Sequence, residues 1–450
     1  MKKILVLILI LSLAIPFAGC TGKKSDENTV KEPIVTAEGT FSIKAVYADP
    51  VAKDTDPAEF MMSDAHMQWM QSYIDKVIAS GEKQDGMDKY YSKIQKELLT
   101  EKPGENKVCS PLNIYFAVSM LAEVSDSETR AQILDALSAG SIEELRDRIG
   151  AIWDANYVDT PALKSILADS LWLRNDIAYS KEPLQRLADE YHASSFSGEM
   201  GSEEMNKVLR DWIDEGTNGL LTDFTKDIKM DPETVLALVS TLYYKAAWAD
   251  KFYEDQTKDM LFHGASGDKS VKMMHRDASM QVYDFDKFIA VSLGLNDSGS
   301  MNLFLPKDGY TPEDIAADAD AMRVSLGAAY ENCSYPVVHL DVPRFEVKNK
   351  TDLKEALMSL GIKDAFDSEK ADFSPLTEDV KGIFVSSAEH AALVKIDEEG
   401  VTGAAYTELF MAGSAMPQDE MYITFDRPFF FSVTARDGSI LFAGTVNNIE

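Results

Sequence analysis

One serine in a run of small residues is the first candidate for chemistry in this sequence. Ser414 follows Gly413 between Met411 and Met416. A hydrolase built on it would need a base beside the hydroxyl, and an α/β-hydrolase would place it in a Gly-x-Ser-x-Gly turn. The residues around Ser414 do not fit that motif, and His390 lies in a strand-like segment. The sequence therefore predicts that the protein is not an enzyme.

The histidines and cysteines are too scattered to indicate a metal site. No His-x-x-x-His and no Cys-x-x-Cys spacing occurs, and local metal motifs rely on such spacings. The sequence therefore predicts no metal and no other cofactor. Cys109 and Cys333 each lie within or beside an apolar, strand-like run, so we expect two unpaired thiols rather than a disulfide. The histidines are His66, His192, His263, His275, His339 and His390.

Cys20 belongs to a segment that predicts export and lipidation. Two lysines precede an apolar run over residues 4–14, which is too short to span a bilayer. The Phe-Ala-Gly-Cys that ends at Cys20 resembles a bacterial lipobox, although an aliphatic residue is commoner where Phe17 stands. An ordinary secretory signal cleaved near Gly19 is the alternative. We expect a lipoprotein signal peptide over residues 1–19 and a lipid anchor at Cys20, on the outer face of a bacterial cell membrane.

Net charge excludes one class of partner. The 450 residues carry a formal charge of −31, and 45% of them are hydrophobic. Nucleic acid and heparin bind to basic surfaces that displace counterions, so neither is expected as a partner. The acidity suits solubility outside the cell, and an acidic surface without any specific partner explains it equally simply.

The elements that must position these residues follow an irregular segment. Residues 20–57 are rich in charged residues, Thr and Pro and lack a sustained apolar period, which predicts a flexible tether. Helical spacing then predicts an extra N-terminal helix over residues 58–84. No linker or internal repeat interrupts residues 58–450, so we expect them to form a single domain.

The order of the elements indicates an α+β fold class, because helices come mainly first and strands mainly last. This order argues against the two α/β lobes of a transporter's substrate-binding lipoprotein. Helices are predicted over residues 87–99, 110–123, 127–137, 181–192 and 206–214. Strands are predicted over 163–173, 235–244, 288–293, 301–305, 335–347, 391–397, 421–426, 429–435 and 440–446. Residues 408–419 have neither period, and a loop of this length is usually functional.

Blocks spread over residues 87–450 together resemble the serpin family. They are Asn106–Ile114, Ala168–Asn175, Trp212–Leu221, Leu242–Trp248, Val342–Phe345, Leu353–Ile362, Ala371–Ser374 and Arg427–Gly444. The resemblance implies a serpin fold, with helices, three β-sheets and an exposed reactive-centre loop. It also implies a metastable state whose loop can enter the main sheet as a new strand.

The function that the resemblance implies is inhibition of a serine protease by a monomer that acts as a suicide substrate. The protease cuts the loop and forms an acyl-enzyme, and insertion of the cut loop then distorts it. Inhibitory members usually carry Glu and Ala where Thr402 and Gly403 stand, so a non-inhibitory module for surface binding or adhesion is the alternative. The matching hinge residues are Glu398, Glu399, Gly400, Val401, Thr402, Gly403, Ala404 and Ala405.

The usual family spacing from Gly400 places the reactive bond between Ser414 and Ala415. An ordinary loop serine, with Met411 or Met416 as the bait, is the alternative. No Arg or Lys lies between Glu399 and Arg427, which disfavours a trypsin-like target. Small residues suit an elastase-like or subtilisin-like protease, with a cysteine protease as a further target class.

The resemblance also implies residues that control the opening of the main sheet. Trp248 matches the tryptophan at the top of the sheet, called the breach, and an ordinary core position is its alternative. Glu398 would pair with a lysine on a neighbouring strand. A polar cluster beneath the sheet, called the shutter, matches Ser110, Asn113, Ser240 and His390, with one serine and the asparagine exchanged. Four unrelated polar residues, with Ser110 only a helix cap, are the alternative.

Overall fold

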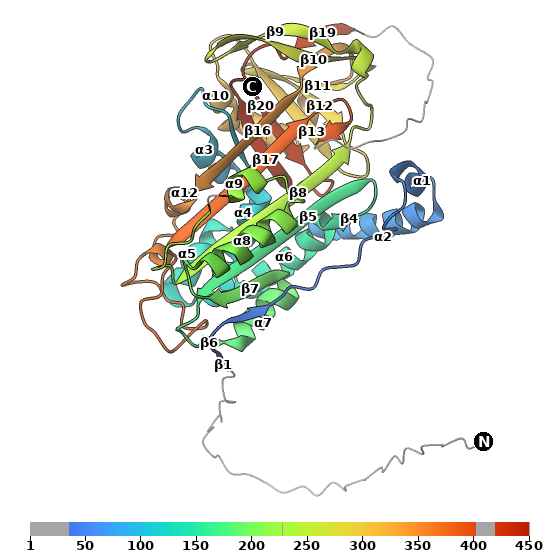
Figure 1. Ribbon diagram of the computed structural model, residues 1–450. Coiled ribbons are helices and arrows are strands. Elements are labelled where there is room, and N and C mark those ends of the chain that lie inside the picture. The colour runs from blue at the N-terminus through green and yellow to red at the C-terminus, as the bar shows by residue number, and fades with distance from the viewer. Residues whose placement is uncertain (1–35, 227, 402–418, 450) are drawn as a thin grey trace, which may run out of the picture. The chain divides into compact units, whose positions relative to one another are not determined.

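The computed structural model describes residues 36–226, 228–401 and 419–449. Helices and three large β-sheets make up this part of the chain (Figure 1), so the predicted α+β class with three sheets is confirmed. No helix in the described ranges is both long and apolar enough to cross a membrane. The predicted signal peptide over residues 1–19, Cys20, Thr402 to Ala405, and the Ser414–Ala415 bond lie outside the described residues.

The helices pack on the main sheet and on the second sheet. They are α1 (Pro57–Met61), α2 (Asp64–Gly81), α3 (Met87–Leu99), α4 (Pro111–Val124), α5 (Ser127–Ala136), α6 (Ile142–Asn156), α7 (Lys181–Glu190), α8 (Glu203–Gly216), α9 (Thr222–Thr225), α10 (Pro312–Ala316), α11 (Ala319–Ser325) and α12 (Lys354–Ser359). Three short 3-10 turns are η1 (Glu254–Gln256), η2 (Tyr330–Asn332) and η3 (Asp364–Phe366).

The main sheet holds the strands that matter most for function. Its order is β16 (Phe345–Asp352), β17 (Ser387–Ile396), β18 (Gly400–Val401), β8 (Leu236–Ala247), β5 (Leu163–Arg174), β7 (Ala193–Gly198) and β2 (Phe41–Ile43), and β4 (Val158–Asp159) pairs with β5. A second sheet has the order β14 (Cys333–Ser334), β11 (Gln281–Asp284), β12 (Phe288–Gly294), β13 (Ser300–Pro306), β20 (Phe429–Thr434), β21 (Ile440–Val446) and β3 (Lys107–Cys109). The third runs β19 (Glu420–Thr424), β15 (Val337–Pro343), β10 (Gly267–Ser279) and β9 (Lys258–Gly264), and β1 (Thr36–Ala37) pairs with β6 (Tyr179–Ser180).

Two helices cover opposite faces of the main sheet (Figure 1). Every residue of α4 is buried, and this helix packs against β5, β8 and β21 in the principal core. On the other face, α8 packs its apolar side over a smaller core around Trp172. Ser110 starts α4 as its N-cap, because its Oγ accepts from the Asn113 N–H at 3.3 Å and Pro111 fits the first turn.

The N-terminal segment corrects two predictions. Residues 36–56 are not a free tether, since β2 pairs with Ser195–Ser197 of β7 and the Val51 N–H donates to Asp159 at 2.8 Å. A short strand at a sheet edge is stabilised by its partner's backbone, which leaves little periodicity in its own sequence. The predicted helix over 58–84 is two helices, α1 and α2, because Ser63 ends the first and caps the second by accepting from the His66 N–H at 3.2 Å.

Candidate functional site

The main sheet is open between β17 and β8. These strands pair only at one end, where Ser387 and Ala388 lie opposite Ala237 and Leu238. At the other end β18 lies between them, with Val401 opposite both Ile396 and Ala246. The structure shows no pairing of residues 389–395 with residues 239–245. The chain that leads into residues 402–418 therefore already occupies one end of the opening.

The first residue of β18 must be small. A Cβ placed on Gly400 would lie 2.2 Å from the carbonyl oxygen of Ala246 and 2.8 Å from the Ala247 Cα. Neither contact can relax cheaply, because both atoms belong to the backbone of β8. Gly400 therefore allows the hinge to come close enough for pairing, and Val401 after it is buried.

Glu398 anchors the base of the hinge through an arginine. Its Oε1 accepts from Arg344 Nε at 2.8 Å and Nη2 at 2.6 Å, and also from the hydroxyl of Thr257. Burial would raise the pKa of Glu398, but the hydrogen bonds from Arg344 and Thr257 outweigh it and hold the pKa below its ordinary value. The implied lysine partner is therefore wrong. Arg344 can hold Glu398 in its ionised form because its guanidinium directs two N–H donors at one carboxylate oxygen.

Trp248 lies directly beneath the hinge. Its ring nitrogen Nε1 donates to the Asp397 carbonyl at 2.8 Å, and its backbone N–H donates to the Glu399 carbonyl at 3.1 Å. The Phe252 N–H donates to the Glu398 carbonyl at 3.2 Å. Trp248 is completely buried, so the same side chain packs in the core and holds the hinge backbone.

The four shutter residues meet where α4 begins. The Ser110 N–H donates to His390 Nε2 at 2.9 Å, and the Ser240 hydroxyl donates to the Asn113 carbonyl at 3.2 Å. These contacts bring β17, α4 and β8 together, and they use backbone groups of Ser110 and Asn113 rather than side chains. Ser110 is both the cap of α4 and a member of the cluster.

The shutter also contains buried atoms without partners. Within the part of the chain that the structure describes, the Asn113 side-chain oxygen and nitrogen and the Nδ1 of His390 have no hydrogen-bond partner. Burial lowers the pKa of His390 to about 4, so its imidazole is neutral at physiological pH. An unpartnered buried polar atom costs free energy, so the shutter is incomplete in this state.

Asp169 of β5 is a member of this region that the sequence analysis missed. It lies opposite Ser240 in the ladder and is 1% exposed. Burial raises its pKa to about 8, and the neighbouring Ser240 hydroxyl lowers it by less. A signal was available, because Asp169 has the same strand parity as the core residues Leu167 and Leu171. A carboxyl at an inward position of a buried strand is unusual.

A small cavity lies at the opening on the α8 side. It measures about 50 Å³ and is lined mainly by apolar side chains, with Ser240 and His390 among its polar ones. Its lining shows that a small space beside β8 and β17 is left unfilled by side chains. The apolar lining includes Leu209, Ile213, Leu221, Ile228, Val239 and Ala391.

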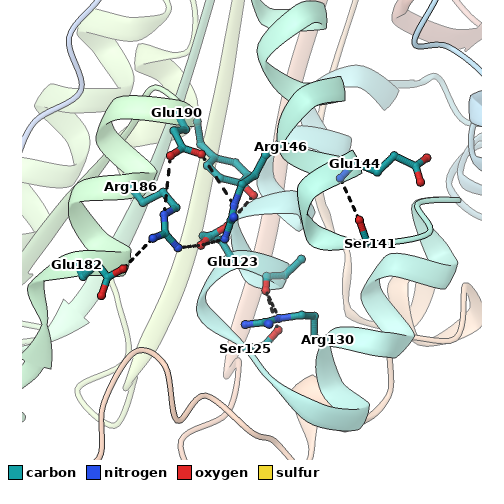
Figure 2. Close-up of polar contacts among 11 residues, drawn as sticks. Glu123, Ser125, Arg130, Ser141, Glu144, Arg146, Glu182, Arg186 and Glu190 are labelled. Atoms are coloured by element: carbon teal, nitrogen blue, oxygen red, sulfur yellow. Dashed lines mark hydrogen bonds and ion pairs between the residues drawn. The ribbon is translucent and has the colours of Figure 1, made fainter. Parts of the chain in front are cut away.

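The far end of α4 is fixed by a buried carboxylate (Figure 2). Glu123 is 2% exposed and accepts from Arg146 at 2.8 and 2.9 Å, from Arg186 at 2.9 Å and from the Tyr191 hydroxyl at 3.0 Å. Burial would raise the pKa of Glu123, but the hydrogen bonds from the two arginines outweigh it and lower it. These bonds tie α4 to α6 and α7, so Ser110 and Asn113 are carried by a helix that is held at both ends.

Comparison with known proteins agrees with this geometry. A family model described as "Serpin (serine protease inhibitor)" matches residues 86–449, and the chain therefore belongs to the serpin family. A serine protease inhibitor of Cyanea capillata is 29% identical over 364 residues, which cover 76% of this chain and 92% of that protein. The leukocyte elastase inhibitor of Sus scrofa is 28% identical over 359 residues, 77% and 94% of the two chains.

Solved structures share the fold. The native state of the thermophilic serpin Tengpin superimposes with a TM-score of 0.73 at 23% identity, covering 90% of this chain and 98% of that one. Serpins are typically inhibitors of proteases rather than catalysts. The cysteines Cys109 and Cys333 are both free, as predicted. No cluster of histidine, cysteine and carboxylate side chains in the described ranges is arranged to hold a metal ion.

Proposed function

We propose that the protein is a monomeric suicide inhibitor of a serine protease. The observation that carries the proposal is the opening between β17 and β8, because the hinge already pairs at one end of it. After cleavage of the loop, the hinge side would extend β18 through the opening. The acylated protease would be carried along and distorted before the ester is hydrolysed.

The register of β18 indicates where each loop residue would go. Val401 lies opposite Ala246 of β8 and Ile396 of β17, and both pairings are antiparallel. Counting six residues forward along the loop and six residues back along each neighbouring strand, Thr407 would lie between Ser240 and His390. Its hydroxyl would face the unpartnered atoms of Asn113 and His390. Insertion would thus complete the shutter, and each new hydrogen bond contributes about 1 kcal/mol.

Apolar burial would add to this driving force. The inward series continues from Val401 through Gly403, Ala405 and Thr407 to Leu409 and Met411, and none of these residues is charged. Burying each large apolar side chain contributes roughly 1.5–3 kcal/mol. Together with the new ladder, the gain is on the order of 10–20 kcal/mol, which would drive insertion nearly to completion.

The proposed target is an elastase-like or subtilisin-like protease. Small residues around Ser414 and Ala415 fit a shallow specificity pocket. The similarity to an elastase inhibitor supports the same class. Incubation with elastase or subtilisin is expected to yield a protease-sized upward shift on a denaturing gel that survives boiling. Clean cleavage near Ser414 without a covalent product would contradict inhibition and leave the non-inhibitory alternative.

A matched pair of hinge variants tests the insertion step itself. Ala405→Glu places a charge on the inward face, opposite Leu242 and Ala392 in the continued register, and should convert the protein from inhibitor to substrate. Ala404→Glu places the same charge on the outward face and should leave most of the covalent complex. Equal yields from the two variants would rule out insertion in this register.

The location is proposed from the N-terminal sequence alone. Acylation at Cys20 would hold the inhibitor on the outer face of a bacterial cell membrane, where it would meet external proteases. Expression of the full chain and of Cys20→Ser in a bacterium tests this proposal. The parent should fractionate with membranes and the variant should be released, whereas release of both would favour an ordinary secretory signal.

A further inference from the structure

The outer face of the third sheet carries a closed chain of polar contacts that starts and ends on β19. His339 Nδ1 lies 2.7 Å from Asp277 Oδ1, and His275 Nε2 lies 3.1 Å from the same oxygen. His275 Nδ1 lies 2.8 Å from Asp341 Oδ1. Asp341 Oδ2 accepts from the hydroxyl of Thr424 at 3.1 Å, at the end of β19.

At the start of β19 the contacts go to His339. The ring of Tyr422 stacks on its imidazole with centroids 4.3 Å apart, and the Glu420 carboxylate lies 3.9 Å from its Nε2. That nitrogen has no hydrogen-bond partner among the residues that the structure describes. A proton on it would attract Glu420, and its loss would remove that attraction.

The geometry at His275 requires a cation to satisfy it. Both ring nitrogens face carboxylate oxygens, at 2.8 Å from Asp341 and 3.1 Å from Asp277. A neutral imidazole has a single N–H, so one of its nitrogens would turn a lone pair towards a carboxylate. Only the imidazolium can donate to both. Histidine is the side chain whose charge normally changes between about pH 5 and pH 8.

The balance of charge in this cluster also favours protonated imidazoles. With both imidazoles neutral, Asp277, Asp341 and Glu420 form a group of three carboxylates, and two imidazolium ions would reduce its net charge to −1. Two cations of the neighbouring elements have other partners: Lys272 pairs with Asp259 of β9 at 3.0 Å, and Arg344 pairs with Glu398. The other charged or titratable groups on these and adjoining elements are Lys258 and His263 of β9, Asp268, Lys269 and Arg276 of β10, Glu254 and Asp255 of η1, and Asp419 before β19.

We infer that this chain of contacts is a proton-dependent clamp on β19. β19 is a five-residue edge strand whose backbone pairs only with β15 in the described sheet. Protonation of His275 and His339 would tighten the strand, and deprotonation would loosen it through repulsion among the three carboxylates. The consequence rests on the proposed function: β19 follows residues 402–418, so a change in its stability with pH would change how firmly the chain is fixed after the proposed reactive bond.

Hydrogen exchange of the full chain tests the clamp without any protease. The protection factors of the β19 amides, corrected for intrinsic exchange, should be about tenfold higher at pH 5.5 than at pH 8, which is the effect of a few partly exposed ion pairs. Amides of β20 and β21 serve as the internal reference and should not change. Equal protection of β19 at both pH values would overturn the clamp while leaving the proposed inhibition untouched.

Three variants locate the effect. The double variant His275→Gln and His339→Gln should bring the protection ratio close to one. His263→Gln is the matched control on the same sheet, since its imidazole pairs with Asp268 at 2.9 Å on the β9–β10 hairpin, and it should keep the tenfold ratio. Should the double variant fail to fold, Asp277→Asn removes one of the three carboxylates and should raise β19 protection at pH 8. A double variant that keeps the full ratio, or an Asp277→Asn that lowers protection at pH 8, would contradict the clamp.

Discussion

Two buried carboxyl groups lie near the opening of the main sheet, Glu398 at the base of the hinge and Asp169 on β5 beside β8, and their protonation differs. Glu398 is 3% exposed and has a pKa below its ordinary value, because Arg344 and Thr257 donate to it. Asp169 is 1% exposed and has a pKa of about 8, since burial dominates and Ser240 offsets little of it. The comparison shows that burial alone does not decide the charge of a carboxyl group; its hydrogen-bond partners do.

The hinge base and the shutter, at the two parts of the opening, also differ in whether their polar groups have hydrogen-bond partners. At the hinge base the polar groups are paired, with Glu398 held by a guanidinium and Trp248 bonded to the hinge backbone. At the shutter, Asn113, His390 and Asp169 keep buried atoms without partners. An incoming strand would therefore gain little new hydrogen bonding at the hinge and more at the shutter. The unsatisfied middle is consistent with a sheet that is stable enough to persist and still favours an added strand.

The largest expected effect is a gain in stability from Asp169→Asn. The folded-state pKa is raised, so the folded state binds an extra proton between about pH 4 and pH 8 and loses stability as pH rises across that window. Each pH unit costs about 1.4 kcal/mol, so across these four units the full difference is on the order of 6 kcal/mol. Melting temperatures at pH 5 and pH 8 should show a gain that is several degrees larger at pH 8.

A matched control for Asp169→Asn is Asp176→Asn. Asp176 is an exposed carboxylate just after β5, paired with Arg174 at 2.6 Å. This change should leave the melting temperature nearly unaltered at both pH values. A gain from Asp169→Asn that does not depend on pH would show that Asp169 is ionised in the fold.

The next largest effect is expected from breaking the ion pair between Arg344 and Glu398. Arg344→Ala leaves Glu398 buried without its cationic partner, which should cost about 2–4 kcal/mol at pH 7. Glu398→Ala leaves a partly exposed arginine and should cost about 1 kcal/mol. Because the pKa of Glu398 is lowered, the pair contributes stability above the ordinary carboxyl pKa and loses it in acid. Melting curves of the two single variants and the double variant measure the asymmetry, and equal losses from the single variants would contradict it.

The smallest effect is expected from removing the single hydrogen bond between Thr257 and Glu398. Thr257→Val removes the hydroxyl that donates to Glu398 and should cost about 1 kcal/mol. Thr257→Ser keeps the donor and should retain most of the stability. The difference in melting temperature between these two variants measures the contribution of the bond, and a loss confined to Thr257→Ser would assign it to packing of the threonine methyl group.

Much of the fold could be predicted because the signals are local. The Ser-Pro pair at residue 110 predicted the start of α4 within one residue, since capping depends on the side chain of that residue. The strand-like, mostly apolar composition of the last segments predicted β20 and β21 nearly to their ends. By contrast, β2 was missed, because a three-residue edge strand depends on the backbone of β7 rather than on its own pattern.

Some features of the candidate site could likewise be predicted from the sequence, and others could not. Small, uncharged residues from Gly400 onward predicted a segment able to enter a sheet, and the structure places Gly400 where a Cβ would collide with β8. Arg344 could not be chosen as the partner of Glu398 from sequence, because the two residues are 54 positions apart and many cations were available. The role of Asp169 became clear only when its burial was known, together with the lack of a cationic partner among the residues that the structure describes.

By itself, the sequence predicted the α+β class of fold, a segment able to enter a sheet, and the succession of helices and strands along the chain, because these depend on residue types and periodicity. Only the tertiary structure decided which strands separate, which polar atoms lack partners, and how β19 is tied to His275 and His339. Those properties depend on distances between residues far apart in the chain, and electrostatic and hydrogen-bond energies change steeply with such distances.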